Sequence, residues 1–438
     1  MNLKKVRFVT LGCKVNQYET QAMRESLLKQ GFSEEREGPS EVIVINTCTV
    51  TEEADRENRY WVRRLRRENP EAKIVVTGCW VERNRKEAED LSEIDLILSN
   101  LEKPDLAERL FQGCATPEIQ KETVPHFRSK AEYSPLQIST FQGHTRAFIK
   151  IQDGCNHACS FCKVVLVRGR SRSRRLAEIV EEAKRLGDSG YREIVLAGIQ
   201  LGAYGLDFEP RVDLISVLEA LNEIPGIERI RLSSIEPTDV KKDLIQAMKR
   251  LPKVCPQLHI PLQSGDSEIL KQMNRRYDRG FYIDLIQTLR REIPDFCLSM
   301  DVMAGFPGEE EVHFENTLSL IRQTRPIRIH AFPYSRRVGT KAAQLQDLPA
   351  ASLRERMNRL LHCSKEVAGE EKQRFLGRTF PVLIEQKITS AGFLQGHTAH
   401  YLKVFLEGPR DWMGKSVSVK LDRIEADGIW GVAEASRE

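Results

Sequence analysis

The sequence lacks a hydrophobic run long enough to cross a membrane, and it lacks a strong excess of one charge. Its first residues include three basic side chains and an apolar stretch at 6–11, which is short and interrupted. Such a segment fits neither a secretory signal nor a membrane span, so we expect a cytoplasmic protein with no membrane partner. The net charge of +4 is too small to predict a polyanionic partner by itself.

The ten cysteines are many for a chain without a secretory signal. The cytosol keeps thiols reduced, which argues against a disulfide framework and leaves metal binding or catalysis as the usual reasons for clustered cysteines. With 438 residues, 40% of them hydrophobic and 30% charged, the chain is too long for one ordinary core and has an ordinary globular composition. We therefore expect two or three folded domains.

The first region, 1–115, repeats a strand, a turn and an amphipathic helix. Apolar runs near 6–11, 42–47 and 73–77 are each followed by a helical pattern. This alternation predicts a wound parallel α/β domain with right-handed crossovers. Each run leads into a cysteine, and these are Cys13, Cys48 and Cys79.

A second region, 141–345, follows a proline-containing linker with little periodicity. Six apolar runs alternate there with helical patterns, which predicts a partial β/α barrel whose active face is the carboxyl end of its strands. The runs lie at 147–151, 193–198, 229–234, 257–262, 298–305 and 327–332. Beyond the barrel we expect a helical connector at 346–376 and a small antiparallel β-barrel at 377–438.

Cys155, Cys159 and Cys162 follow the first barrel strand at the spacing C-x3-C-x2-C. Three thiolates in so tight a loop can hold three corners of a four-iron cluster, and they leave the fourth iron without a protein ligand. The amino and carboxylate groups of S-adenosylmethionine could chelate that iron, which would permit reductive cleavage to a carbon radical. The alternative is a structural zinc site with His157 as its fourth ligand.

Cys13, Cys48 and Cys79 are too far apart in the sequence for one local loop. Because parallel strands end at the same edge of a sheet, these thiols can nevertheless meet and hold a second cluster. The alternative is that each is a small buried hydrophobic residue. We prefer that interpretation for the other four cysteines, which are Cys114, Cys255, Cys297 and Cys363.

A run of basic residues with no acidic residue among them follows the second triplet. We expect it to contact RNA phosphates, with binding that weakens as salt rises, although a solvated helix start or internal ion pairs are the alternative. The expected contacts are Arg168, Arg170, Arg172 and Arg174. A second basic set at 59–67 is flanked by Glu57 and Glu68, and there RNA contact and a solvated face are equally supported.

The spacing of the second triplet, Phe161 and the segment Gly305–Glu309 resemble the radical S-adenosylmethionine superfamily. The resemblance implies that the adenine ring of the cofactor packs beside Phe161. It also implies a cofactor pocket lined by Ser233, Glu236 and Gln263.

Over nearly the whole chain, the sequence resembles the methylthiotransferases, which carry a three-cysteine domain before the radical domain and a TRAM module after it. The segments 11–20, 145–155 and 332–335 are most similar to the MtaB branch. That branch converts N6-threonylcarbamoyladenosine beside the anticodon of tRNA to its 2-methylthio derivative. The resemblance implies two 4Fe-4S clusters, S-adenosylmethionine, a tRNA partner and an electron donor of the flavodoxin or ferredoxin type, and it does not identify the sulfur donor.

Three other functions stay open. Relatives in the same family act on isopentenyladenosine in tRNA or on an aspartate of a ribosomal protein, and a non-catalytic iron–sulfur sensor that binds RNA is the third. The chain also departs from the usual family pattern at 163–167, which has a lysine and no proline before Arg168. Ala158 and the pair Arg336-Arg337 are further departures.

Overall fold

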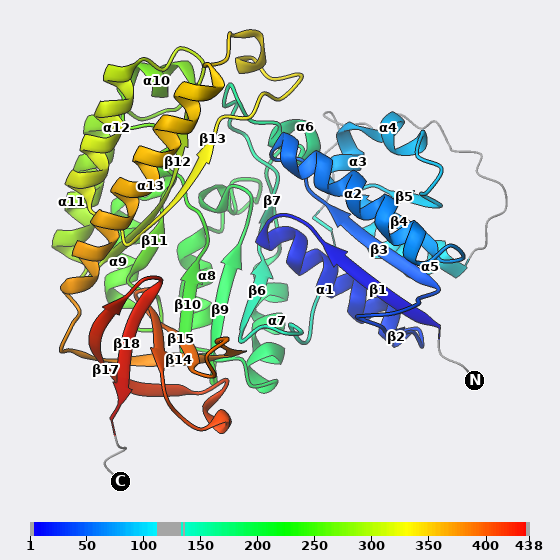
Figure 1. The fold of residues 1–438 in the computed structure, drawn as a ribbon. Coiled ribbons are helices and arrows are strands. Elements are labelled where there is room, and N and C mark those ends of the chain that lie inside the picture. Colours follow the sequence, from blue (N-terminus) through cyan, green and yellow to red (C-terminus); the bar gives the residue numbers. More distant parts are fainter. Residues whose placement is uncertain (1–3, 112–132, 135, 435–438) are drawn as a thin grey trace.

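The computed structural model describes residues 4–111, 133–134 and 136–434, so Cys114 and most of the predicted linker lie outside the described residues. The described part forms three bodies, as Figure 1 shows. The first is a parallel sheet with the strand order β2-β1-β3-β4-β5. Its elements are β1 (Lys5–Thr10), α1 (Lys14–Lys29), β2 (Ser33–Glu34), β3 (Val42–Thr47), α2 (Glu52–Glu68), β4 (Lys73–Gly78), α3 (Cys79–Arg83), α4 (Arg85–Glu89), β5 (Leu96–Leu98), the 3-10 turn η1 (Lys103–Asp105) and α5 (Leu106–Phe111).

Strand β3 is buried along its whole length because helices cover both faces of this sheet. Val42 and Val44 belong to a core cluster on one face, together with residues of α1 and α5. Ile43 and Ile45 belong to a second cluster, which includes Val62 of α2. Successive strand residues point to opposite faces, so one apolar run supplies both cores.

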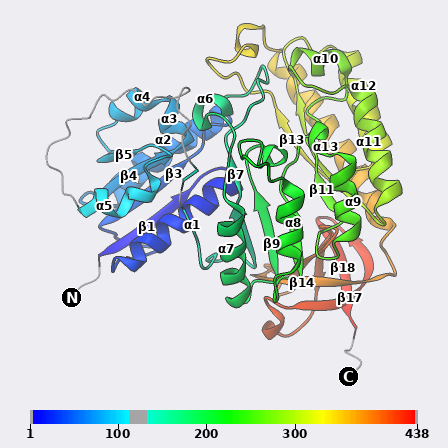
Figure 2. The same ribbon diagram turned by 180° about the vertical axis from the view of Figure 1, so that it is seen from behind.

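The second body contains two three-stranded parallel sheets, β6-β9-β10 and β11-β12-β13, which a bridge between Ser234 and His259 links in chain order. Figure 2 shows helices α7, α8, α9 and α11 along the outer side of these strands. The elements are β6 (Arg146–Lys150), β7 (Gln152–Asp153), α6 (Val164–Arg168), β8 (Arg172–Ser173), α7 (Leu176–Asp188), β9 (Glu193–Ala197), η2 (Leu201–Ala203), α8 (Leu214–Asn222), β10 (Arg229–Leu232), η3 (Pro237–Asp239), α9 (Lys242–Arg250), β11 (Gln257–His259), α10 (Ser267–Gln272), α11 (Arg279–Glu292), β12 (Cys297–Ala304), α12 (Glu311–Thr324), β13 (Arg328–Pro333) and η4 (Ala342–Gln344).

The third body is a closed barrel with the strand order β14-β15-β16-β18-β17, which follows the long helix α13. The elements are α13 (Ala350–Gln373), β14 (Thr379–Ile388), β15 (Leu394–Thr398), β16 (Lys403–Leu406), η5 (Arg410–Trp412), β17 (Ser416–Glu425) and β18 (Gly428–Ala433). The predicted fold class is therefore confirmed: a parallel α/β domain, a partial β/α barrel and a small β-barrel.

Arginines at the amino ends of the barrel strands hold the third body. Arg229 Nη1 donates to the carbonyl oxygen of His397 at 2.8 Å, and Arg231 Nη1 donates to that of Ala399 at 3.0 Å. At the other end, helix α6 packs against α3 of the first body. The first two bodies therefore meet near the carboxyl ends of the strands. None of the described helices is both long and apolar enough to cross a membrane.

Candidate active site between the first two domains

The three cysteines of the first domain follow the ends of β1, β3 and β4: Cys13 and Cys48 lie on loops, and Cys79 is the first residue of α3. Cys13 is exposed, whereas Cys48 and Cys79 are buried. Burial, together with the nearby Cys79 and Cys13 thiols, raises the pKa of the Cys48 thiol to about 12. The parallel sheet has therefore brought together three thiols that are far apart in the sequence.

Backbone contacts hold these loops against one another. Asn16 Nδ2 donates to the carbonyl oxygens of Leu11 at 2.8 Å and Thr47 at 2.9 Å, so one amide joins the first two loops. Gly78 has a φ of 104°, and a Cβ added there would lie 2.4 Å from the carbonyl oxygen of Thr47. Only glycine combines that backbone conformation with so close an approach.

The second triplet forms a compact loop after β7. The Cys155 amide donates to the carbonyl oxygen of Gly169 at 3.0 Å, which fixes the start of the loop to the end of α6. The His157 amide lies 3.3 Å from Cys155 Sγ, and Arg275 Nη1 lies 3.3 Å from Cys159 Sγ. Hydrogen bonds to the sulfur atoms help to set the reduction potential of a thiolate-bound iron–sulfur cluster, and these donors fit such a cluster.

The thiols themselves favour their protonated forms. Burial raises the pKa of Cys155 to about 11 and that of Cys162 to about 12. A metal must therefore displace these protons, as metal binding to cysteine generally does. This fits residues whose purpose is ligation and not free nucleophilic attack.

His157, the fourth ligand of the zinc alternative, is engaged elsewhere. Its Nε2 atom lies 2.8 Å from Gln200 Nε2, a residue that follows β9. Among the described residues, no three His, Cys, Asp or Glu side chains are grouped as ligands of one metal ion. In a four-iron cluster each thiolate binds a different iron, so its ligands need not surround a single point.

A buried network of ion pairs joins the two thiol loops. Arg168 Nε donates to Cys79 Sγ at 3.1 Å, while Arg168 Nη2 donates to Asn16 Oδ1 at 2.6 Å. The same guanidinium pairs with Glu19 of α1 and with Asp153, at 2.5 and 3.5 Å. The side chain of Arg168 is only 1% exposed. One arginine of the radical domain therefore connects the loops of both triplets.

This burial argues against the RNA role predicted for two of the four arginines. Arg168 is enclosed as described, and Arg174 is buried against Glu182 at 3.0 Å and the hydroxyl of Tyr18 at 3.2 Å. Phosphates cannot reach these guanidinium groups in this structure. The alternative of internal ion pairs applies to both, because their acidic partners come from other segments of the fold.

The other two arginines of that run have different surroundings. Arg172 pairs with Asp153 at 3.1 Å and its side chain is 13% exposed, so it belongs mainly to the buried network. Arg170 is exposed. It is the exposed member of the predicted set, and its contact with RNA stays a prediction.

The residues predicted to line the cofactor pocket lie at or beyond the carboxyl ends of β10 and β11. Ser233 Oγ and Gln263 Oε1 are buried without a hydrogen-bond partner among the described residues. Gln263 also has a φ of 65°, which is strained for a side chain of its size and is typical of functional sites. Unpartnered buried polar atoms of this kind fit a site that binds a polar ligand.

The other two predicted cofactor residues adjoin the second triplet: Phe161 lies within its loop, and Glu236 is connected to it through Arg275. Glu236 forms an ion pair with Arg275, which also contacts Cys159 Sγ. Phe161 packs against a small core cluster that contains Phe306 and Tyr334. Sequence reasoning missed Arg275 because nothing in its local sequence distinguishes it from other surface arginines; only the fold brings it to the thiol.

Three family models match the chain, each over a different region. Residues 5–99 match the Uncharacterized protein family UPF0004, residues 149–321 the Radical SAM superfamily, and residues 373–427 the TRAM domain. The fold resembles that of TsrM, a radical S-adenosylmethionine methyltransferase from Kitasatospora setae, with a TM-score of 0.56. That likeness covers 78% of this chain and 77% of TsrM at 14% identity, so it supports the fold alone.

Curated relatives match the chain almost from end to end. The threonylcarbamoyladenosine tRNA methylthiotransferase MtaB of Chlamydia pneumoniae is 40% identical over 97% of both chains. MtaB of Bacillus subtilis (strain 168) is 35% identical over 95% of this chain and 93% of its own. A tRNA-2-methylthio-N(6)-dimethylallyladenosine synthase of Clostridium botulinum (strain Okra / Type B1) is 35% identical, covering 96% and 95%. The chain belongs to the radical S-adenosylmethionine methylthiotransferase family, in its MtaB-type branch.

Proposed function

We propose that this enzyme adds a methylthio group to N6-threonylcarbamoyladenosine in tRNA by radical S-adenosylmethionine chemistry. The observation that carries the proposal is the presence of two cysteine triplets, joined through the contact of Arg168 with Cys79 Sγ at 3.1 Å. A radical domain alone needs one triplet. The other triplet, in a domain that the MtaB relatives share, supports a reaction that also transfers sulfur.

In this proposal, Cys155, Cys159 and Cys162 hold one 4Fe-4S cluster, and the other triplet, at 13, 48 and 79, holds the second. When bound, these clusters and S-adenosylmethionine supply the electron, the radical and the sulfur chemistry. The unpartnered oxygens of Ser233 and Gln263 would orient the cofactor.

The buried charges around Glu19 would hold the two loops at a fixed separation. Reactions between separately bound groups depend steeply on their relative placement, so a rigid connection of this kind favours transfer from one site to the other. Arg168 comes from α6 and Glu19 from α1, so the network fixes one domain against the other.

The partners follow from the same reaction. We propose tRNA as the substrate, a cytoplasmic location where tRNA is present, and a flavodoxin or ferredoxin type of protein as the electron donor. The sulfur donor is not assigned.

A second candidate substrate is dimethylallyladenosine in tRNA, because relatives with that named activity match over 96% of the chain. Their identity is 35%, against 40% for the Chlamydia pneumoniae MtaB. The two nucleosides differ in mass, so one measurement separates the two functions.

The experiment is mass spectrometry of tRNA nucleosides from a strain that lacks the gene, complemented with variants. The wild-type chain should restore the 2-methylthio derivative of threonylcarbamoyladenosine, and a C155A/C159A/C162A variant should not. Cys255→Ala is the matched control, since this buried cysteine lies beside Arg231 at the opposite end of the barrel. Restoration of only the dimethylallyl derivative would favour the second candidate. Full restoration by the triple variant would reject the radical mechanism.

A further inference from the structure

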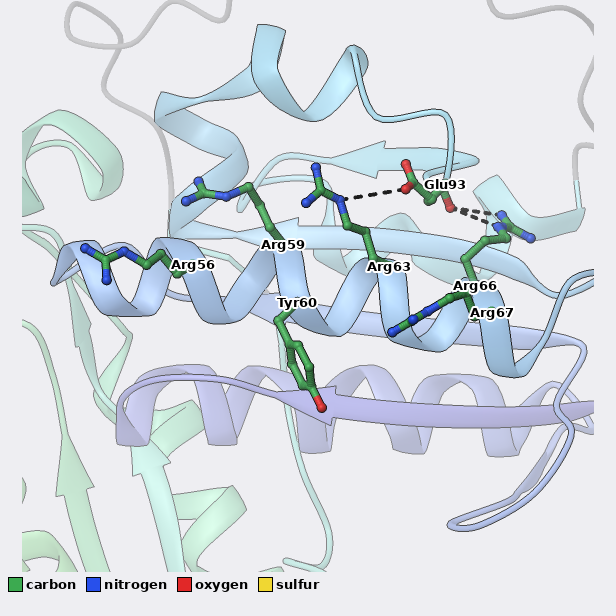
Figure 3. A pocket seen from close by; sticks show the side chains of 7 residues that line it. All are labelled: Arg56, Arg59, Tyr60, Arg63, Arg66, Arg67 and Glu93. Atoms are coloured by element: carbon green, nitrogen blue, oxygen red, sulfur yellow. Dashed lines mark hydrogen bonds and ion pairs between the residues drawn. The ribbon is translucent and has the colours of Figure 1, made fainter.

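Outside the thiol site, the N-terminal domain carries a groove of about 670 Å³ along helix α2. Figure 3 shows its lining, which includes Tyr60 and a single carboxylate, Glu93. The remaining lining residues are Arg56, Arg59, Arg63, Arg66 and Arg67. Five guanidinium groups and one carboxylate line the groove, although the chain as a whole is nearly balanced in charge.

The arginines form a stripe because of their spacing. Arg56, Arg59, Arg63 and Arg66 recur every three or four residues, which places them on one face of the helix. At 1.5 Å per residue the stripe is about 15 Å long. A nucleic-acid strand carries one charge per roughly 3.4 Å of helix axis and winds around that axis, so the stripe is long enough for only a few successive phosphates.

All four arginines of the stripe have acidic partners, and most of these pairs lie at the surface. Arg56 pairs with Glu52 at 3.1 Å, and Arg66 pairs with Asp95. Arg59 pairs with Glu87 at 2.9 Å and Arg63 with Glu93 at 3.9 Å, and the side chain of Arg63 is 58% exposed. Arg67 is exposed and forms no ion pair with a described residue. Exposed ion pairs contribute little to stability, so a phosphate can replace the carboxylate at little cost.

The helix that carries the groove begins near the candidate active site. Helix α2 starts four residues after Cys48, and its first turn is fastened to the radical domain. The Glu52 amide donates to Ser335 Oγ at 3.0 Å, and Arg337 pairs with Asp55 at 2.8 Å. Figure 1 shows that α2 then runs away from the barrel along the outer face of the first domain.

An aromatic surface lies beside the stripe. Tyr60 is 53% exposed and meets Trp61 edge to face, with ring centroids 5.8 Å apart. Arg64 lies over both rings. Exposed aromatic rings next to arginines are typical of surfaces on which unpaired bases stack.

We propose that this arginine groove on α2 is a docking surface for the phosphate backbone of the tRNA substrate, separate from the C-terminal β-barrel. The proposal rests on the proposed function, since it takes tRNA as the substrate. An RNA whose reacting base lies at the thiol loops would extend along α2 and place successive phosphates on the stripe.

The test compares tRNA binding by two triple variants of the full-length chain. R59Q/R63Q/R67Q removes three charges from the groove and leaves Arg66, which donates to the carbonyl oxygens of Ala72 and Glu93 and so supports the fold. The matched control removes three exposed arginines from α9, α12 and α13, and these are Arg250, Arg322 and Arg354.

The probe is tRNA from the gene-deletion strain, titrated over a salt series. The groove variant should bind about tenfold more weakly at ~0.1 M salt and lose about 2–3 from the slope of log affinity against log salt. The control and the RNA-independent cleavage of S-adenosylmethionine should stay unchanged.

Unchanged affinity and slope in the groove variant would overturn the docking surface and leave the proposed function intact. A variant with normal tRNA binding but slower reduction by flavodoxin would likewise overturn it and assign the groove to an acidic protein partner. If the wild-type chain gives no methylthio nucleoside, the proposed function fails, and the docking proposal fails with it.

Discussion

At the scale of single residues, Glu19 is the centre of the buried charge network. Its carboxylate accepts from Lys150 at 2.7 Å and also pairs with Lys103 and Arg168. Burial raises the pKa of this carboxyl, but Arg168, Lys103 and Lys150 together hold the pKa well below its usual value. The glutamate is therefore ionised, and its charge is what allows three cations to be buried together.

Replacing Glu19 with glutamine should strongly destabilise the protein. The amide keeps the shape but leaves three buried cations without their shared anion, which typically costs about 3–5 kcal/mol. Urea unfolding at neutral pH measures the loss. Glu35→Gln, which weakens the surface pair with Lys5 at 3.3 Å, is the control and should cost far less. Equal losses in the two variants would contradict the role of the network.

At the scale of elements, the junction of β4 and α3 positions Cys79. The strand ends at Gly78 and the helix begins at the next residue, so the chain turns within one position. That turn needs the positive φ of Gly78 and its close approach to Thr47, which immediately precedes Cys48. The conformation of one glycine therefore sets two of the thiol positions.

Gly78→Ala should lower both stability and cluster content. The new Cβ would lie 2.4 Å from the carbonyl oxygen of Thr47, so the two loops must separate. Iron in the anaerobically reconstituted protein should fall by about half if each triplet holds four irons. Gly31→Ala is the matched control, because Gly31 has a φ of 84° and no atom within 4 Å of the added Cβ. It should cost only about 1–2 kcal/mol of backbone strain with full iron content, and full iron in Gly78→Ala would contradict the expectation.

At the scale of the whole molecule, buried polar groups fix the C-terminal barrel to the radical domain. Glu193 pairs with Arg231 at 2.7 Å. Burial by itself would raise the pKa of Glu193, but Arg231 and the neighbouring arginines lower this pKa to about 2. The imidazole ring of His400 packs against the rings of Phe375 and Phe380, with centroids 5.5 and 5.1 Å away. Burial lowers the pKa of His400 to about 4.

His400 should make the protein sensitive to mild acid. Its pKa is lower in the folded state than the usual 6.5, so the folded state favours neutral imidazole and binds fewer protons than the unfolded state. The contribution of neutral His400 to the free energy of unfolding is therefore fully present above pH 6.5. It falls by roughly 2–3 kcal/mol as the pH drops towards 4. Glu193 contributes a separate loss at lower pH, between its usual value near 4.5 and about 2.

Urea unfolding at pH 7.5 and pH 5 would measure this loss. His400→Phe keeps an aromatic ring in place but cannot be protonated, so the variant should lose about 1–2 kcal/mol less between the two pH values. The same pH dependence in both proteins would show that other groups control acid stability.

The candidate site shows which of its features local sequence patterns can indicate and which they cannot. The C-x3-C-x2-C spacing and the recurrence of a cysteine after three strands depend on local patterns and on the geometry of parallel sheets, so both could be read from the sequence. Ser233 and Gln263 could be predicted only through resemblance to a family. Arg275 could not be predicted, because its contact with Cys159 joins residues 116 positions apart.

The sequence by itself determined the three-domain order, the strand periodicity and the two sets of thiols, because each is encoded in residues close together or in a repeated pattern. Only the tertiary structure decided which arginines of the basic run are exposed. Arg168 and Arg170 are neighbours in one basic run, yet Arg168 is buried against Glu19, 149 positions away, while Arg170 is exposed. Charge partners are selected by distance in space and by burial, and neither quantity is present in a linear run of residues.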